Sequence, residues 1–233
     1  MTAVGSGSGR EAGSMLVTTR VATEADVEGM ARLHLASFSR DEHLGVLLGP
    51  GFVRASYRWH VTDDTAYVIV AELDDRLVGL LGMCDVPFTT RMMKGCIPAF
   101  LGALARRPRL LVGRPLWSRL ARSQAGEEWV GRFCSTPKVA QMTIGAVDAA
   151  ARGHSVFPAL IGRCEDISRS RGIRAVRAGV YRSNAACRRA FVKSGWTEVP
   201  ALGSAETVFF VRAFDPDVIR DFPQLADAGV AGR

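Results

Sequence analysis

A short basic turn between an expected strand and an expected helix holds the residues best suited to bind an anion. The apolar run 139–147 is typical of a strand, and apolar residues at three- and four-residue steps predict a helix over 156–171. Between them stand Arg152 and Gly153, a cation and a residue that lets the backbone approach a ligand closely. A turn of this kind presents several backbone N–H groups at the positive end of the helix dipole. The pattern therefore predicts a site for phosphate groups.

The segments that follow this turn repeat the element order of a known superfamily. An apolar strand over 174–181 comes next, then Asn184, and then a helix that ends at Gly195. This order resembles the GNAT superfamily of acyl-CoA-dependent N-acyltransferases, whose motif at the strand–helix junction is Arg/Gln-x-x-Gly-x-Gly/Ala. The resemblance implies an α/β fold with a GNAT-like mixed, mostly antiparallel sheet flanked by helices. The residues that carry it are Arg152-Gly153-His154-Ser155-Val156-Phe157, Ser183-Asn184-Ala185-Ala186-Cys187-Arg188-Arg189-Ala190-Phe191 and Lys193-Ser194-Gly195-Trp196.

The resemblance also implies how acetyl-CoA, or another acyl-CoA, would be held. Backbone N–H groups of 153–157 would bind the pyrophosphate. The strand that ends at Val147 would pair with the pantetheine arm and supply an N–H to the thioester oxygen. Asn184 would hydrogen-bond the pantetheine, or cap the helix that follows it, or do both. The implied cofactor-binding residues are Ala146, Val147, Arg152, Gly153, His154, Ser155, Val156, Phe157, Asn184 and Cys187, the last of which we expect to serve in packing.

Three side chains depart from the family pattern. Ser155 replaces a glycine, but it is small and we expect it to cap the helix. The ring of Phe157 would crowd the pyrophosphate unless it points into the core. Phe191 replaces the tyrosine that often protonates the departing thiolate, and a benzyl side chain donates no proton. Tyr181, at the end of the preceding strand, is a candidate substitute donor, with a structural role as the alternative.

Direct attack of an amine on a thioester also needs a base, usually a carboxylate that acts directly or through water. Asp85 ends the central strand, and Glu127 and Glu128 stand in the segment that follows it. Asp148 belongs to the basic turn and is expected to shape it. These residues do not single out one base. The candidate catalytic residues are Asp85, Glu128 and Tyr181.

The composition predicts one domain over 15–214 with a tail at each end. The Gly- and Ser-rich segment 1–14 is typical of disorder, and the Asp-, Pro-, Ala- and Gly-rich segment 215–233 of partial order. Thr23 with Asp26 marks a helix start. Further strands are expected over 16–22, 66–73, 76–86 and 206–214, with Asp74-Asp75 as a hairpin turn and with Gly79 and Gly82 indicating a bulge or close packing.

Three aromatic side chains of the first hundred residues raise the question of an acceptor pocket. In the family, the region between the first two strands shapes that pocket. Tyr57, Trp59 and His60 are candidates to line it, with plain packing as the alternative for each. For His34 we expect a structural role.

The segment 87–137 is a basic insertion and carries the whole net charge of the chain. It holds nine Lys and Arg against two Glu, and the chain as a whole has a net charge of +7. Apolar residues at helical spacing around 97–104 and 116–120 predict two short amphipathic helices. Three interpretations stay open: a lid on the acceptor side, contact of 91–122 with an anionic membrane surface, and a basic face for a phosphorylated acceptor.

Composition also bounds the class of protein. Five widely spaced cysteines without a Cys-x-x-Cys pair favour reduced thiols over disulfides or a zinc site, so we expect a cytoplasmic protein that uses no metal. The sequence contains no run of about eighteen apolar residues, so we expect no membrane-spanning helix. The basic segment allows nucleic-acid binding, but no reading motif supports it, and no such partner is expected.

Together these features predict an N-acetyltransferase that moves an acetyl or short acyl group from acyl-CoA to an amine of a small-molecule acceptor by direct attack. An amino sugar is one acceptor class among several, and a homodimer remains open. The alternative is a non-catalytic acyl-CoA-binding or membrane-associated interaction protein with the same fold, which the phenylalanines at 157 and 191 would explain.

Overall fold

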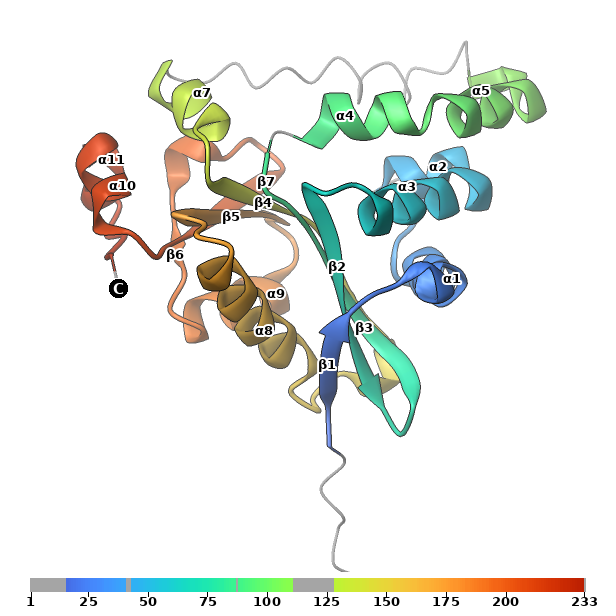
Figure 1. Cartoon of the computed structure of the whole chain (residues 1–233), viewed down its shortest axis with the longest axis horizontal. Coiled ribbons are helices and arrows are strands. Elements are labelled where there is room, and N and C mark those ends of the chain that lie inside the picture. The colour runs from blue at the N-terminus through green and yellow to red at the C-terminus, as the bar shows by residue number, and fades with distance from the viewer. Residues whose placement is uncertain (1–15, 41–42, 87, 111–127, 233) are drawn as a thin grey trace, which may run out of the picture.

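A seven-stranded mixed sheet organises the chain (Figure 1). The computed structural model describes residues 16–40, 43–86, 88–110 and 128–232. Neighbouring strands are antiparallel except β4 and β5, which are parallel. In spatial order the strands are β1 (Thr18–Val21), β2 (Ala66–Leu73), β3 (Arg76–Cys84), β4 (Val139–Val147), β5 (Ala175–Tyr181), β7 (Thr207–Ala213) and β6 (Thr197–Glu198). The mixed, mostly antiparallel sheet predicted from the sequence is confirmed.

Helices cover both faces of this sheet. On one face α8 (Val156–Ser170) packs with α9 (Ala185–Lys193) around the largest apolar cluster. The other face is shared by two groups, with α1 (Val27–Ser37) and α3 (Pro50–Thr62) over the β1–β4 half. Over the β5–β7 half lie α7 (Glu128–Ser135), α10 (Pro216–Asp221) and α11 (Pro223–Asp227). Short 3-10 turns η1 (Glu24–Asp26), η2 (Pro108–Leu110), η3 (Ala149–Ala151) and η4 (Pro200–Leu202) join the elements.

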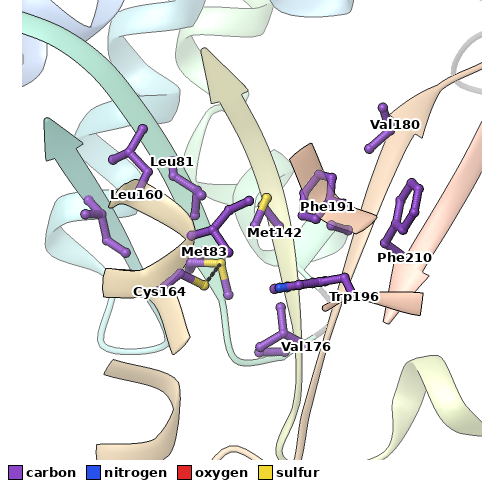
Figure 2. Close-up of a cluster of buried hydrophobic side chains, with 14 of the residues drawn as sticks. Leu81, Met83, Met142, Leu160, Cys164, Val176, Val180, Phe191, Trp196 and Phe210 are labelled. Atoms are coloured by element: carbon purple, nitrogen blue, oxygen red, sulfur yellow. Dashed lines mark hydrogen bonds between the residues drawn. The ribbon is translucent and has the colours of Figure 1, made fainter. Parts of the chain in front are cut away.

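The core between α8, α9 and the sheet joins aliphatic and sulfur-containing side chains to a group of three aromatic rings (Figure 2). Phe191 of α9 stacks on Phe210 of β7 with 5.2 Å between ring centroids, and Trp196 lies edge-on to it at 5.0 Å. The indole N–H of Trp196 donates to Glu165 of α8 at 2.9 Å, which gives this buried carboxylate a partner. Cys164 of α8 reaches Met83 of β3 at 3.5 Å. These contacts fix α8 against β3 and α9 against β7, the strands on either side of β4 and β5.

The two glycines inside β3 do what the sequence suggested. A Cβ on Gly79 would lie 2.7 Å from Val156 Cγ1, so the missing side chain lets α8 pack closely on the strand. Gly82 stands where the register between β3 and β4 shifts, and Thr143 is the extra residue of β4 at that point. The hairpin turn at Asp74 and Asp75 is also confirmed, since both residues take the positive φ of 49° and 58° that a tight hairpin needs.

Part of the basic insertion forms helices, as predicted. In the described residues it contains α4 (Phe88–Gly95) and α5 (Ile97–Arg106), which lie over α2 (Leu44–Leu48) and α3 (Figure 1), and also α7. The second expected helix, around 116–120, falls outside the described residues, as does Glu127. In the described part of the chain no helix combines the length and the apolar character that crossing a membrane requires.

The C-terminus differs from the sequence prediction. Where a partly ordered tail was expected after residue 214, two short helices pack on the sheet. Val218 of α10, Leu225 of α11 and Phe222 between the two helices are buried there. Burial of these apolar side chains orders a segment whose Asp and Pro content is typical of a partly ordered tail.

Candidate active site

The site is built where the two parallel strands part. Pairing of β4 with β5 covers only 139–142 against 175–178. Beyond this, β4 stays paired with β3 and β5 with β7, so the two strands diverge and their facing edges are not hydrogen-bonded to each other. Half of the backbone N–H and C=O groups of 143–147 therefore point into the gap. An unpaired strand edge of this kind is a template for an extended ligand.

A cavity of about 240 Å³ fills this gap. Met142 and Phe191 in its wall belong to the apolar cluster under α8 and α9, whereas Ile144 packs with the cluster under α1 and α3. The cavity thus passes through the sheet from one face to the other. The two strands contribute Met142, Thr143, Ile144, Gly145, Gly179, Val180 and Tyr181, and Phe38, His43, Phe157, Asn184, Cys187, Phe191 and Thr207 complete the wall.

A second cavity, of about 340 Å³, continues from the first toward the turn before α8. It is lined by Ala146 and Val147 of β4, by Arg152 of the turn, and by Ala186 and Ala190 of α9. Five residues line both cavities: Phe38, Gly145, Phe157, Asn184 and Cys187. Together the two spaces trace a path from the gap between the strands to the start of α8.

The turn at the start of α8 has a backbone suited to an anion. Gly153 has φ of 88°, and a Cβ there would meet no atom within 4 Å, so this backbone is open. The first N–H groups of α8, at Val156 and Phe157, have no carbonyl of a preceding helical turn to bind. Arg152 adds a positive charge beside them. Asp148 shapes the turn, as expected, because its side chain accepts a hydrogen bond from Ala150 N at 2.9 Å.

Ser155 differs from its prediction. It stands at the N-cap position of α8, but its side chain makes no capping hydrogen bond. Its φ of 58° is left-handed, a conformation that a glycine adopts without strain and that costs other residues about 1–2 kcal/mol. A glycine at this position of the family motif would adopt this backbone conformation without strain, whereas Ser155 adopts it with strain.

Phe157 lies on the path between the two cavities. Its ring packs over Gly145 of β4, where a Cβ would be 3.3 Å from Cε2, and it meets Phe191 edge-on at 5.5 Å between centroids. The side chain is half-buried against the α8–α9 core. The ring is thus turned away from the turn of 152–155 and toward the strands, and it forms part of the wall of both cavities.

Asn184 and Cys187 open α9 at the same path. Asn184 Oδ1 accepts a hydrogen bond from Cys187 N at 3.1 Å, so Asn184 caps the helix. Asn184 also lines both cavities. Burial raises the pKa of the Cys187 thiol to about 12, so it stays a neutral thiol near pH 7. A neutral thiol at this place agrees with the packing role expected from the sequence.

Of the three candidate catalytic residues, the structure brings one to the cavity. Tyr181 lines it at the end of β5. Asp85 follows the end of β3 that pairs with the closed part of β4, and its carboxylate binds the guanidinium of Arg171 at 2.7 Å. Glu128 is the exposed first residue of α7. Neither carboxylate is among the residues that line the two cavities.

Beside the cavity lie two hydrogen-bonded groups that the sequence does not predict. One is centred on His34, and the other joins His60 to Thr143. His34 Nδ1 lies 2.9 Å from Tyr57 Oη, and His34 Nε2 lies 3.1 Å from Nδ1 of His43, which lines the cavity. His60 Nε2 lies 3.0 Å from Thr143 Oγ1. Burial lowers the pKa of His34 to about 3, with a smaller contribution from His43, so its ring is neutral near pH 7. Because Thr143 and His60 are distant in sequence, no spacing rule could have joined them.

In the described residues no group of three or more His, Cys, Asp or Glu side chains is arranged to hold a metal ion. The polar side chains that line the cavity carry hydroxyls, an imidazole and an amide: Tyr181, Thr143, Thr207, His43 and Asn184. These side chains donate and accept protons and hydrogen bonds. What the arrangement can do chemically is therefore to hold an extended ligand along a strand edge and to move protons beside it.

Comparison with solved structures identifies the fold. No protein-family model and no curated protein sequence matches the chain. Among solved structures, the PaiA N-acetyltransferase from Thermoplasma acidophilum in complex with coenzyme A is similar with a TM-score of 0.54 at 11% identity, covering 86% of this chain and 100% of that one. The GNAT domain of PAT from S. lividans has a TM-score of 0.54 at 14% identity, covering 84% and 90%.

A third structure, a GCN5-related N-acetyltransferase from Kribbella flavida, has a TM-score of 0.52 at 16% identity, covering 84% of this chain and 97% of that one. Each of these proteins is matched over most of its length, so the likeness covers the whole fold and not one motif. The chain therefore has the GNAT fold, as the motif over 152–196 led us to expect.

Proposed function

We propose that the chain is an acyl-CoA-dependent N-acyltransferase of the cytoplasm. It would transfer an acetyl or short acyl group to the amine of a small-molecule acceptor by direct attack. The observation that carries this proposal is the gap between β4 and β5, where an unpaired strand edge and a cavity lead past Phe157 to an open helix start with Arg152 beside it. The likeness to a fold that was solved in complex with coenzyme A supports it.

Each part of the path suits one part of the thioester. The turn of 152–155 and the first N–H groups of α8 would bind the pyrophosphate. The free edge of β4 at Ala146 and Val147 would pair with the pantetheine amides. The thioester carbonyl would then lie in the gap, where a backbone N–H of β4 stabilises the charge that develops on its oxygen. Tyr181 lines the cavity there and would donate a proton to the leaving sulfur.

The test begins with binding. Titration calorimetry with acetyl-CoA is expected to register saturable heat, and Arg152→Ala should weaken the affinity because it removes a cation from the phosphate site. Release of free CoA is then followed with a panel of amines that includes small aliphatic amines, amino acids and amino sugars. Transfer to at least one amine supports the proposal. No heat with any CoA thioester, or hydrolysis without transfer, would refute it.

A non-catalytic acyl-CoA-binding protein is the second candidate, and one observation favours it. Phe191 is buried in an aromatic stack at the position where the family tyrosine would donate a proton, and it carries no hydroxyl. This candidate predicts heat with acetyl-CoA and no transfer to any amine of the panel. Ile97 and Leu101 are exposed on α5, and such apolar side chains favour membrane association of this non-catalytic protein. Flotation with anionic vesicles would show that association.

A further inference from the structure

The bulge of β4 aims one hydroxyl at a buried imidazole. Opposite the register shift at Gly82, Thr143 is the extra residue of β4, and bulges commonly redirect a side chain beside an active site. A Cβ on Gly82 would lie 2.7 Å from Thr143 Oγ1, so this glycine leaves the space that the hydroxyl occupies. Thr143 Oγ1 then reaches His60 Nε2 of α3 at 3.0 Å. The contact depends on the bulge and the glycine together.

The hydrogen bonds of His60 fix which atom holds which proton. His60 Nδ1 lies 2.7 Å from the carbonyl oxygen of Ser56, one turn earlier in α3. A carbonyl oxygen only accepts, so Nδ1 carries the hydrogen and Nε2 of the neutral ring has the lone pair. The hydroxyl of Thr143 must therefore donate to Nε2. A hydroxyl, an imidazole and a group that orients the imidazole are the three parts of an activated hydroxyl.

The surroundings keep this imidazole neutral. His60 is 3% exposed, and burial lowers its pKa, against smaller opposing effects from the Ser56 carbonyl and from Asp63. Arg91 of α4 pairs with Asp63 at 3.3 Å and so offsets that negative charge. Tyr57 of the same helix lies 6.2 Å away between ring centroids, and burial raises its pKa, so it is uncharged. A neutral ring with an oriented lone pair is the form that accepts a proton.

Thr143 also lines the cavity in the gap between β4 and β5, where the proposed thioester would react. Its oxygen donates its own hydrogen to His60 and keeps lone pairs that accept a hydrogen bond from a ligand. On the far side of the cavity stands Tyr181. The hydroxyl is thus the link between the reacting groups and a base that is itself out of contact with solvent.

We propose that Thr143 and His60 form a proton relay for acyl transfer, a step that rests on the proposed function. As the amine nitrogen bonds to the thioester carbon, one N–H bond breaks and its proton goes to Thr143 Oγ1. The proton of the hydroxyl goes to His60 Nε2. When the C–S bond breaks, the proton on Nε2 returns through the same two atoms to the sulfur. Protons and charge balance, and no further reactant is needed.

The relay also accounts for the departure at Phe191. A proton that returns from His60 to the sulfur does the work of the tyrosine hydroxyl that Phe191 lacks. Tyr181 would then share in this second transfer or orient the acceptor. Thr143 touches the reacting atoms in this scheme and is a catalytic residue, whereas His60 acts through it.

The test uses substitutions that separate proton transfer from packing. Thr143→Val removes the hydroxyl at nearly constant volume, and Thr143→Ser restores it. His60→Gln still accepts the hydrogen bond of Thr143 through its amide oxygen but takes up no proton. We expect Thr143→Val and His60→Gln each to lower kcat about 10²-fold, the lower range of general acid–base catalysis. The KM for acetyl-CoA and the calorimetric affinity should stay near the wild-type values.

Two further variants sharpen the result. The double variant, with Thr143→Val and His60→Gln together, should have a kcat no lower than that of the slower single variant. Either substitution alone already breaks the relay, so the second causes no further loss. Thr143→Ser should recover kcat to within about tenfold of wild type, since the hydroxyl is back. Thr62→Val is the matched control: its hydroxyl binds the Arg58 carbonyl at 2.8 Å on α3, outside the cavity.

Three outcomes would overturn the relay. The first is wild-type kcat in a folded Thr143→Val that still binds acetyl-CoA. The second is a loss in His43→Gln that exceeds the loss in Thr143→Val, which would assign the proton to the His43–His34 pair. The third is a wild-type chain that binds the thioester and acylates no amine, which refutes the proposed function first and the relay with it.

Discussion

The close approach of α8 to β3 gives a sharp test of how the phosphate-binding turn is held. Gly79 pairs with Ala71 and Val147 in the middle of the sheet, and its bare face lies under α8. A methyl group there would be 2.7 Å from Val156 Cγ1 and 3.0 Å from Leu160 Cδ1. Both of those side chains are buried, so neither gives way cheaply. The substitution Gly79→Ala must therefore push the start of α8 off the strand.

The magnitude follows from two opposing effects. Overpacking a core by a methyl group costs about 1–3 kcal/mol, and removing a strand glycine returns about 0.5–1 kcal/mol by restricting the unfolded chain. The net loss is about 1–2 kcal/mol. For a chain of this size it corresponds to a fall in Tm of about 2–8 °C. Because the displaced end of α8 carries the turn with Gly153, the affinity for acetyl-CoA should fall as well.

A glycine of α8 provides the control for the substitution in β3. Gly162 is exposed in the middle of α8, and a Cβ there would meet no atom within 4 Å. Gly162→Ala should raise the unfolding free energy by about 0.5–1 kcal/mol, because alanine favours a helix interior. Differential scanning calorimetry measures the Tm of Gly79→Ala and of Gly162→Ala. An unchanged or higher Tm in Gly79→Ala would refute the packing argument and the placement of α8 on β3.

Three further predictions address the turn, the cap and the buried His34. Ser155→Gly should raise the unfolding free energy by up to about 1 kcal/mol in urea titrations, since it removes left-handed strain; a loss would show that the hydroxyl holds the turn. Asn184→Ala should cost about 1 kcal/mol as a lost cap, whereas Asn184→Asp should keep the cap, and weaker acetyl-CoA binding in a stable Asp variant would separate ligand contact from capping. His34, with its pKa lowered to about 3, stays neutral in the fold while the unfolded chain takes up its proton below about pH 6.5. Stability should therefore fall by up to about 1.4 kcal/mol per pH unit from pH 6.5 downward for this group, and an equal slope in His34→Gln would contradict it.

The parts of this fold that local sequence decides were predictable. Two consecutive aspartates between apolar runs gave the hairpin turn, and Asn184 before a helical pattern gave the cap. The apolar run of 139–147 gave β4. In each case the physics is contained within a few residues: positive φ at a tight turn, a side-chain oxygen at a helix start, strand propensity in a short apolar run.

The parts that depend on distant neighbours were not predictable. The glycines of β3 indicate a bulge or close packing, but nothing in the run around Thr143 shows that the extra residue lies in β4 at this position. The sequence predicts His60 only as one of three candidates to line the acceptor pocket, because its partner Thr143 is 83 residues away. A serine before a helix predicts a cap, and only the φ of Ser155 shows that this one is strained and makes no capping hydrogen bond. Spacing rules apply within an element and stop at its ends.

Phe191 shows how one substitution couples the core to the site. A tyrosine at this position would have to bring its hydroxyl out of an aromatic stack formed with Phe210 and Trp196 (Figure 2). A phenylalanine needs no polar partner, so it packs fully and leaves the cavity wall apolar at that point. In the proposed relay the proton is taken up on the opposite face of the sheet, where α3 and the bulge of β4 meet. That is where the neutral imidazole of His60 and the hydroxyl of Thr143 lie, and so the apolar wall and the proposed relay are two consequences of one packing arrangement.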